Sequence, residues 1–273
     1  MQRQTSSTTA ALTFDSITCT FPARGDRGSY TAVQDVSLAV ADGEFVSLLG
    51  PTGCGKSTLL NVAAGLLAPS AGRVGLFGRP LAAINGEAGY LFQSDALFPW
   101  RNALDNVAAG LEFRGVRRDQ ARASAAQWLE RVGLGQHAAK YPHELSGGMR
   151  KRVALAQTLI LAPRILLMDE PFSALDVQTR QLMENELLAL WAQDAKSVLF
   201  VTHDLEEAIA LSDRVVVLSA GPESRPIAEF TIDLPRPRDV SEVSLQPRFV
   251  ELHAAIWRAL KREVMKAQEH AQP

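Results

Sequence analysis

The residues with the clearest chemical role form one glycine-rich loop that carries a lysine and hydroxyl side chains. The loop fits the pattern G-x-x-x-x-G-K-[ST] and consists of Gly50, Pro51, Thr52, Gly53, Cys54, Gly55, Lys56, Ser57 and Thr58. Glycines in such a loop let successive backbone N–H groups turn towards an anion. Lys56 supplies a positive charge for the outer phosphates of a nucleotide, and the Ser57 hydroxyl can bind Mg²⁺. The loop therefore predicts a binding site for ATP or GTP.

Two acidic side chains form the second group with a chemical role. Asp169 and Glu170 directly follow the apolar run 165–168, which predicts a buried parallel strand whose carboxylates emerge at the carboxyl edge of a sheet. We expect Asp169 to hold Mg²⁺, directly or through water, beside Ser57. Glu170 can polarise a water molecule aimed at the γ-phosphate. Acids that end a strand are often helix caps, but the phosphate-binding loop upstream favours the functional interpretation.

Gln93 and His203 are expected at the same edge of the sheet. Gln93 ends a predicted strand over 88–93, and His203 follows the buried run 197–201. A glutamine in a loop is usually solvated, so Gln93 alone carries little weight. His203 fits two roles, as a structural histidine or as a γ-phosphate contact that holds the water together with Glu170.

A helix start with two glycines suits either capping or anion binding. Ser146 can cap a predicted helix over 147–161 and leave the N–H groups around Gly147 and Gly148 pointed at an anion. A plain capped helix start explains the same residues. The cations at 150–152 are most simply a solvated first turn, although positive charge at a helix N-terminus opposes the macrodipole and hints at a phosphate nearby.

These side chains need a framework in which strands end at one edge of a sheet. A buried strand over 44–49 precedes the glycine-rich loop, and a helix over 58–64 follows it. Upstream, strands over 12–21 and 32–40 flank a loop at 24–28. The beginning of the chain is therefore predicted to combine a strand–loop–helix unit with a β hairpin.

The middle of the chain changes from strands to helices. Helical spacing over 102–113 and 119–132 indicates a helical insertion at about 94–162 in a sheet domain. Asp176 fits the N-cap position of a further amphipathic helix over 177–193.

The end of the chain is predicted to hold one more strand, a linker and a long helix. The strand covers 215–218, and prolines at 222 and at 235 and 237 mark the linker. The predicted helix over 247–266 has one apolar face, formed by Phe249, Leu252, Ile256, Trp257, Leu260 and Val264. We expect this face to pack on its own domain, with a dimer or membrane-protein contact as the alternative.

Length and composition limit the possible classes of protein. The chain has 273 residues and a net charge of −2, so nothing in the charge balance argues for a nucleic-acid partner. Cys19 and Cys54 cannot form a disulfide framework, which fits a reducing compartment. No apolar run reaches the roughly 18 residues of a membrane span, and the N-terminus lacks a secretory core. We divide the chain into a disordered segment over 1–11, one domain over 12–240 and a C-terminal helix over 241–273.

Together, the motifs resemble the ATP-binding subunit of ABC transporters over residues 12–240. The resemblance rests on the Walker A loop Gly50 to Thr58, the Q-loop Gln93, the signature Leu145-Ser146-Gly147-Gly148-Met149, the Walker B acids Asp169-Glu170, the D-loop Ser173-Ala174-Leu175-Asp176 and the switch histidine His203. Met149 stands where glutamine is commoner, and Gln157 stands where many members have arginine. The resemblance implies a P-loop NTPase of the α/β class with a mainly parallel core sheet, an N-terminal antiparallel β region and a helical subdomain, with ATP and Mg²⁺ as ligands.

The resemblance also implies roles for single side chains. Glu170 would orient or deprotonate the attacking water, His203 would contact the γ-phosphate, and Gln93 would link the metal and the water to the helical subdomain. The aromatic residue that stacks on adenine falls most naturally on Phe21, with Tyr30 as the second candidate.

In this family two copies face head to tail around two nucleotides. The resemblance therefore implies that Ser146, Gly147 and Gly148 of one copy close the nucleotide bound to the other, and it adds Asp176 of the D-loop to the nucleotide-binding residues. A single chain would then hold half of each site.

Within the family, the segment 97–107 looks like that of the nitrate, sulfonate and taurine importer group. This likeness implies separate membrane permease subunits, a separate solute-binding protein, and a peripheral place on the cytoplasmic face of the cell membrane. We expect Trp100 and its neighbours to dock a coupling helix of the permease.

Two other functions fit parts of the sequence. A soluble ABC ATPase that acts on ribosomes or DNA usually has two ATPase halves or a long coiled-coil insertion, and this chain shows neither. A P-loop kinase would leave the Ser-Gly-Gly signature without a purpose. Co-purification with membranes rather than ribosomes, or a phosphorylated small-molecule product, separates these alternatives from a transporter subunit.

Overall fold

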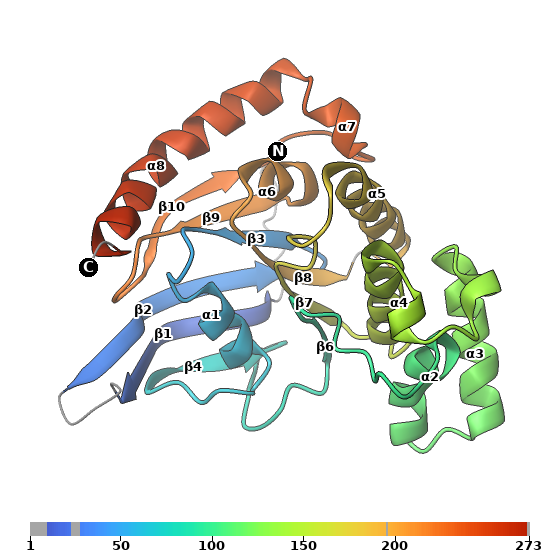
Figure 1. Cartoon of the computed structure of the whole chain (residues 1–273). Helices are drawn as coiled ribbons and strands as arrows, with labels where there is room; N and C mark the ends of the chain where they lie inside the picture. Colours follow the sequence, from blue (N-terminus) through green and yellow to red (C-terminus); the bar gives the residue numbers. More distant parts are fainter. Residues whose placement is uncertain (1–9, 23–27, 195, 272–273) are drawn as a thin grey trace, which may run out of the picture.

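A six-stranded sheet forms the centre of the fold (Figure 1) in the computed structural model, which describes residues 10–22, 28–194 and 196–271. The strand order is β10-β9-β3-β8-β7-β6, and neighbouring strands are parallel except for β10 with β9. The strands are Phe45–Leu49 (β3), Ala88–Leu91 (β6), Ile165–Asp169 (β7), Ser197–Thr202 (β8), Arg214–Leu218 (β9) and Pro226–Thr231 (β10). Every residue of β3 and β8 is buried, as a parallel sheet covered on both faces requires. The prediction of a mainly parallel core sheet is confirmed.

A four-stranded antiparallel sheet lies beside the central sheet, in the order β2-β1-β4-β5. Its strands are Ala10–Pro22 (β1), Ser29–Ala41 (β2), Ala71–Leu76 (β4) and Arg79–Pro80 (β5). The predicted N-terminal β region is therefore present. The loop predicted at 24–28 lies outside the described residues except for Gly28.

The prediction of disorder over 1–11 is wrong for its last two residues. Ala10 pairs with Ala41 of β2, and Ala11 is fully buried in the core. Both side chains are small and apolar, so they extend the strand without exposing a polar group. The remainder of the segment, 1–9, lies outside the described residues.

Helix α1 (Lys56–Ala63) connects the two sheets. It begins directly after the glycine-rich loop and packs against strands of both sheets (Figure 1). Its Leu59 and Leu60 are fully buried in one cluster with Val46 and Leu48 of β3 and Leu12 of β1. This packing fixes the direction in which the N-terminal end of α1 points.

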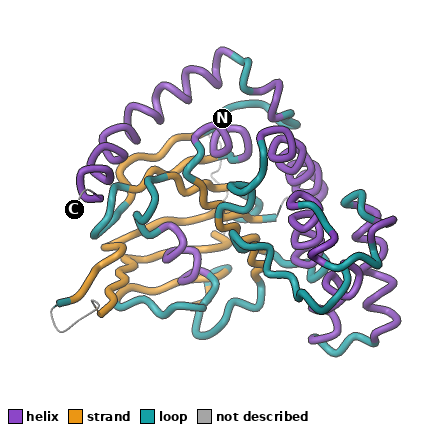
Figure 2. Tube along the Cα trace, viewed as in Figure 1, coloured by secondary structure: helices purple, strands orange, loops and turns teal. Residues whose placement is uncertain are grey.

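The chain between β6 and β7 forms a helical part with its own core. The helices are α2 (Ala103–Phe113), α3 (Arg118–Arg131) and α4 (Gly147–Leu159), with short 3-10 turns at Gly135–His137 (η1) and Pro142–Glu144 (η2). Val107, Leu129 and Val153 come from the three helices and are fully buried in one cluster. In Figure 2, α2 and α3 lie at one side of the molecule, away from the strands, whereas α4 packs against β6 as well as against α2.

Helices α5 (Val177–Asp194), α6 (Leu205–Leu211), α7 (Val240–Val243) and α8 (Pro247–Ala271) complete the fold. We call α6, α7, α8 and β10, with the segments that join them, the C-terminal layer. Among the described helices, none is both long enough and apolar enough to cross a membrane.

The face of α8 packs on its own domain, as predicted. Phe249, Leu252, Ile256 and Leu260 are buried in the same cluster as residues of α6, β9 and the segment after β10. The prediction that Trp257 belongs to this face is wrong, because Trp257 follows Ile256 by about 100° around the helix and its side chain is 43% exposed.

Strand β10 lies in the segment that the sequence predicts to be a linker. Half-buried and exposed residues alternate along Pro226–Thr231, and the strand lies at one edge of the sheet, antiparallel to β9. An edge strand of this kind lacks the continuous apolar run that marks the buried strands.

Candidate functional site

The predicted residues of the carboxyl edge line one cavity of about 340 Å³. Its walls are Phe21, Tyr30, Ala32, Thr52, Gly53, Gly55, Lys56, Ser57, Thr58, Gln93, Asp169 and Glu170. Of the other predicted site residues, Gly50, Pro51 and Cys54 are buried behind this surface, and His203 reaches the cavity through its bond to Glu170. The structure thus brings together strand ends that lie far apart in the sequence.

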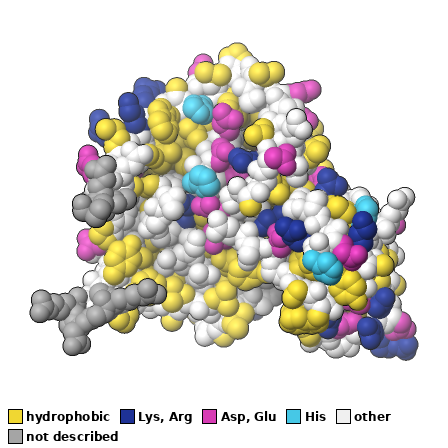
Figure 3. Space-filling model, in the orientation of Figure 1, with side chains coloured by type: hydrophobic (Ala, Val, Ile, Leu, Met, Phe, Trp, Pro, Cys, Tyr) yellow, Lys and Arg dark blue, Asp and Glu magenta, His cyan; other side chains and the backbone are white. Residues whose placement is uncertain are grey.

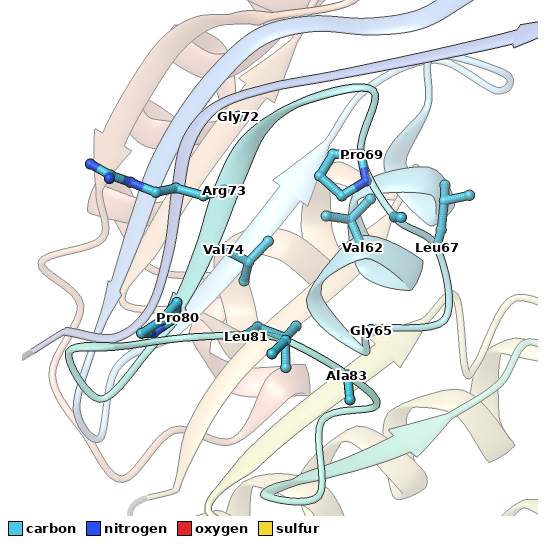
Figure 4. A pocket seen from close by; sticks show the side chains of 12 residues that line it. Val62, Gly65, Leu67, Pro69, Gly72, Arg73, Val74, Pro80, Leu81 and Ala83 are labelled. Atoms are coloured by element: carbon cyan, nitrogen blue, oxygen red, sulfur yellow. The ribbon is translucent and has the colours of Figure 1, made fainter.

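A second cavity, of about 290 Å³, lies between the end of α1 and β4 (Figure 4). Aliphatic side chains such as Val62, Leu67 and Leu81 form its walls, and Arg73 points away from them. The Arg73 guanidinium pairs with Asp15 at 2.8 Å. Arg73, the cation among the described residues that line this cavity, is therefore already paired with a carboxylate and does not point at a ligand there.

The glycine-rich loop has the backbone conformation that its sequence predicts. Gly53 and Gly55 have φ angles of 81° and 89°, in the left-handed region that favours glycine. A Cβ atom on Gly55 would lie 2.5 Å from Cγ1 of Val33, so the position also excludes any side chain on steric grounds. Helix α1 starts at Lys56, directly after Gly55, and its first N–H groups therefore point towards the cavity.

Lys56 is held at the floor of the cavity. Its ammonium group donates to the carbonyl oxygens of Gly50 and Pro51 at 2.8 and 3.0 Å, and it lies 3.8 Å from Oε1 of Glu170. Only 4% of the residue is exposed. A lysine fixed in this way presents a localised positive charge where the outer phosphates of a nucleotide would lie.

Ser57 and Asp169 meet across the cavity. The Ser57 hydroxyl donates to Oδ1 of Asp169 at 2.9 Å. Burial raises the pKa of Asp169, the Ser57 hydrogen bond opposes this shift, and the neighbouring charge of Glu170 adds to it. One hydroxyl and one carboxylate are the hard oxygen ligands that Mg²⁺ prefers, so these two residues fit a magnesium site.

Glu170 and His203 form a second pair. Nδ1 of His203 lies 2.9 Å from Oε2 of Glu170, and the backbone N–H of Glu170 donates to the carbonyl of Val201 at 2.9 Å. Glu170 has a φ angle of 42°, which is uncommon for a residue with a side chain. The hydroxyl of Ser173 donates to the Glu170 carbonyl at 3.0 Å and helps to hold this turn. Strained backbone of this kind is typical of functional positions, and here it directs the carboxylate towards Lys56.

Gln93 is an exposed residue at the edge of the cavity, and its backbone is fixed by α4. The Lys151 ammonium donates to the Gln93 carbonyl at 2.5 Å and lies 3.2 Å from Oδ1 of Asp95. Arg150 pairs with the same carboxylate at 2.8 Å, and Arg152 lies 3.3 Å from Glu186. The predicted solvated first turn is therefore wrong, because protein carboxylates pair with these cations.

Phe21 and Tyr30 are both candidates for stacking on a base. They are direct partners in the pairing of β1 with β2, and both line the cavity. Phe21 also packs against the core between the sheets, whereas Tyr30 is 42% exposed. The choice between them stays a prediction.

The signature and the D-loop lie at helix starts. The Ser146 hydroxyl accepts from the N–H of Met149 at 3.3 Å and caps α4, and Asp176 accepts from the N–H of Thr179 at 3.0 Å and caps α5. Within the part of the chain that is described, Ser146, Gly147, Gly148 and Asp176 do not line the cavity.

Arg180 is a site neighbour that the sequence analysis missed. Its guanidinium donates to Oδ2 of Asp204 at 3.0 Å and to the carbonyl of Leu175 at 3.3 Å. It therefore joins the D-loop to the residue after His203. The only signal in the sequence is an arginine in the first turn of a capped helix, and that pattern is common.

Comparisons with known proteins agree with this geometry. The sequence profile described as ABC transporter matches residues 33–173, which is 141 of 273 residues. The taurine import ATP-binding protein TauB of Pseudomonas aeruginosa is 44% identical over 249 residues, which cover 90% of this chain and 94% of that protein. An uncharacterised ABC transporter ATP-binding protein of Methanocaldococcus jannaschii is 44% identical over 257 residues, which cover 94% of this chain and 93% of that protein.

A solved structure is also similar over most of the chain. It is the dimeric ATP-binding cassette MJ0796 in a post-hydrolysis state, bound to ADP and Pi, with a TM-score of 0.72 and 30% identity. The match covers 82% of this chain and 100% of that one. It confirms the predicted P-loop NTPase fold, and with the profile match it supports ATP hydrolysis. The chain therefore belongs to the ABC transporter family, as an ATP-binding subunit with ATPase activity.

Proposed function

We propose that the chain powers an importer for taurine or a similar small solute, and that hydrolysis occurs at the cavity of the carboxyl edge. The observation that carries the hydrolytic part is the convergence of Lys56, Asp169, Glu170 and His203 on one cavity. Glu170 orients or deprotonates the attacking water, and His203 holds the Glu170 carboxylate and contacts the γ-phosphate.

The other residues bind and orient the nucleotide. Lys56 and the N–H groups of the loop bind its phosphates, and Phe21 or Tyr30 stacks on adenine. Ser57 and Asp169, with Gln93 nearby, would hold Mg²⁺, which neutralises charge on the phosphate oxygens when bound.

We further propose that two copies assemble head to tail. Ser146 is exposed at the start of α4 and, like Gly147 and Gly148, lies outside the cavity of its own chain, as far as the described residues show. A second copy that brings these groups to the nucleotide explains that position, and the similar cassette was solved as a dimer.

Mixing two inactive variants tests this assembly. Lys56→Ala disables the loop of one copy, and Ser146→Arg disables the signature of the other. A mixed head-to-tail dimer retains one site with both parts intact, and about half of the dimers in an equal mixture are mixed, so the mixture should regain about a quarter of the wild-type ATPase activity. Each variant alone should be inactive. A mixture that stays inactive although both variants bind each other would argue against the proposal.

The surface between β6 and α2 suits a permease helix. Trp100 and Phe113 are 72% and 71% exposed, and Phe98 lies between them with ring centroids at 5.6 and 6.2 Å. Figure 3 shows hydrophobic side chains gathered over this region. An adjacent groove of about 240 Å³ includes Phe98, Phe113 and residues 154, 157 and 158 of α4. Exposed aromatic clusters of this size are typical of protein interfaces.

The aromatic surface is held rigidly. The Asn106 amide accepts from the N–H of Phe98 at 2.7 Å and donates to the carbonyls of Phe98, Arg101 and Asn102 at 2.9 to 3.1 Å. The guanidinium of Arg101 also lies over the rings of Phe98 and Phe113. A surface that is ordered in advance loses less entropy when a partner binds.

Trp100→Asp tests the docking surface. We expect assembly with the permease and solute uptake to fall strongly, while ATPase activity of the isolated subunit stays within about twofold, because Trp100 does not line the cavity. Ile84→Asp is the control, since Ile84 is also 72% exposed but lies outside this surface. Unchanged uptake by the Trp100 variant would exclude the surface as the docking site.

Our proposal for the transported solute rests on the relatives named as taurine import proteins and on the segment 97–107. We propose a solute-binding protein and permease for taurine or a related sulfonate or nitrate, with this subunit on the cytoplasmic face. Uptake of labelled taurine, another sulfonate and nitrate in cells carrying this chain or its Lys56→Ala variant tests the assignment. A soluble ATPase would be favoured if the chain fractionated with ribosomes and cells with the Lys56→Ala variant took up all three solutes normally.

A further inference from the structure

The segment 219–225 lies between β9 and β10 and forms a closed turn, which we call the β9–β10 turn. The N–H of Ser219 donates to the carbonyl of Arg225 at 2.9 Å, and the hydroxyl of Ser224 donates to the carbonyl of Ser219 at 2.8 Å. These two hydrogen bonds close the turn on itself.

One side of this turn is hydrogen-bonded to β2, the strand that carries Tyr30 and Ala32 on the side of the cavity where adenine would stack. The N–H groups of Glu223 and Ser224 donate to the carbonyls of Thr31 and Ala32 at 2.8 and 3.1 Å, and Gln34 donates back to Ser224 at 3.0 Å. Ala32 itself lines the cavity. A shift of the turn would therefore act directly on this wall.

The same turn supports the glycine-rich loop from behind. A Cβ atom built on Gly221 would lie 3.3 Å from the Gly53 carbonyl oxygen, 3.7 Å from Cα of Cys54 and 3.5 Å from the Tyr30 hydroxyl. Gly221 thus packs close to the backbone that surrounds the phosphates and close to one of the two candidate stacking residues.

Helix α8 holds this turn through one carboxylate. Oε2 of Glu263 accepts from the backbone N–H of Ala220 at 2.9 Å, and Oε1 accepts from Lys266 at 2.7 Å. Only 6% of Glu263 is exposed. Burial acts to raise the pKa of Glu263, but the bonds from Lys266 and Ala220 outweigh it and the pKa is lowered, so the group is a carboxylate at neutral pH.

We propose that Glu263 is a positioning residue for nucleotide binding, because it holds the β9–β10 turn against the glycine-rich loop and so couples α8 to the affinity for ATP. The inference rests on ATP occupying the cavity described above. It is carried by the hydrogen bonds between Ala220 and Glu263 and between Ser224 and Ala32, and by the close approach of Gly221 to the Gly53 carbonyl.

The test compares Glu263→Ala with Glu263→Gln by steady-state ATPase kinetics and by binding of ATP to the full-length subunit. Alanine removes the acceptor of the Ala220 N–H, whereas the glutamine oxygen can still accept it. We expect Glu263→Ala to raise the KM and Kd for ATP about fivefold with kcat within about twofold, the order expected if part of one buried hydrogen bond acts at the nucleotide. Glu263→Gln should restore both constants to within about twofold.

Lys266→Met is the matched control, because it removes the second partner of Glu263 and leaves the bond to Ala220 in place. Unchanged ATP affinity in folded Glu263→Ala, or an equal loss in Glu263→Gln, would overturn the inference. If Glu263→Ala does not fold, Gly221→Ala decides. Its added Cβ would lie 3.3 Å from the Gly53 carbonyl oxygen, so the turn or the loop must shift by a few tenths of an ångström, and ATP binding should weaken while α8 stays intact. A wild-type subunit that does not bind ATP would instead refute the nucleotide site.

Discussion

Polar side chains serve opposite purposes at the carboxyl edge of the central sheet and in the C-terminal layer. At the edge they bond to one another, as in Ser57 with Asp169 and Glu170 with His203, around a cavity open to a ligand. In the C-terminal layer, several buried side chains instead bond to backbone groups inside the protein, beside ion pairs such as Arg248 with Asp233. The clearest case is Arg238, whose guanidinium donates to carbonyls of Ile209, Ala210, Ser212, Ile232 and Leu234.

The difference predicts which property each region controls. Bonds between side chains at an open cavity place charge and protons, so their loss should change rates more than stability. Bonds from a buried side chain to the backbone satisfy groups that water cannot reach, so their loss should change stability first. Three substitutions test this division, from the largest expected effect to the smallest.

Glu170→Gln should lower the rate of ATP hydrolysis at least about 100-fold, because the amide cannot accept the proton of the attacking water. ATP affinity should stay within a few-fold, since Lys56 and the loop are unchanged. Single-turnover hydrolysis and equilibrium ATP binding measure the two quantities. Glu206→Gln is the control, because Glu206 is an exposed acid in the first turn of α6. Substantial hydrolysis by Glu170→Gln would remove the edge from its catalytic role.

Arg238→Met should lower the free energy of unfolding by about 2–4 kcal/mol, because buried carbonyls at the end of α6 lose their donor. Burial lowers the pKa of Arg238 to about 10, so the native side chain is still charged at neutral pH. Urea unfolding measures the loss, and the ATPase rate per folded molecule should change little. Arg248→Met is the control, since Arg248 forms an exposed ion pair with Asp233. Equal losses in the two variants would contradict the division.

Glu207→Gln should make stability less dependent on pH. Burial raises the pKa of Glu207 to about 8 and that of nearby Glu184 to about 7, well above the ordinary value of about 4.3. The native state therefore keeps protons that the unfolded state releases, and stability falls as the pH rises from about 4 through 8. The substituted side chain is a neutral amide at every pH in this range, so the stability of the variant should fall less as the pH rises.

Melting temperatures at pH 6 and pH 9 test this effect. The wild-type Tm should fall about 2–4 °C more than that of Glu207→Gln over this range, and Glu206→Gln should behave like the wild type. The Thr202 hydroxyl, which contacts Glu207, can bond to the amide as well. If the Tm of the Glu207 variant fell more steeply with pH than that of the wild type, the Glu207 carboxyl would not be protonated in the native state at pH 6.

The same comparison explains which features the sequence predicts. At the edge, each residue follows its own buried apolar run, and parallel strands bring their ends together, so the sequence alone predicts that Asp169, Glu170 and His203 lie on one side of the sheet. The fold class follows from the same runs. In the C-terminal layer, the partners of Arg238 and one partner of Glu263 are backbone groups, which are alike in every residue and leave no signal in the sequence.

Glu263 shows which contacts of the C-terminal layer the sequence hides and which feature of the residue itself could have been recognised. Its partner, the N–H of Ala220, lies 43 residues away and has no side-chain signature. Its own position was readable, because it follows Leu260 by three residues on the apolar face of α8. The pairing of Lys151 with Asp95 could not be predicted either, because the two residues lie 56 positions apart (about five average helix lengths) in separate parts of the chain.

Lys151 also joins the helical part of the protein to the edge of the central sheet. Its ammonium group contacts two acceptors at once, the Gln93 carbonyl and the Asp95 carboxylate, on one short segment. Because only 4% of its side chain is exposed, water cannot replace these partners. A shorter side chain at this position would therefore release the segment that carries Gln93 from α4 and leave the Asp95 carboxylate with one partner fewer.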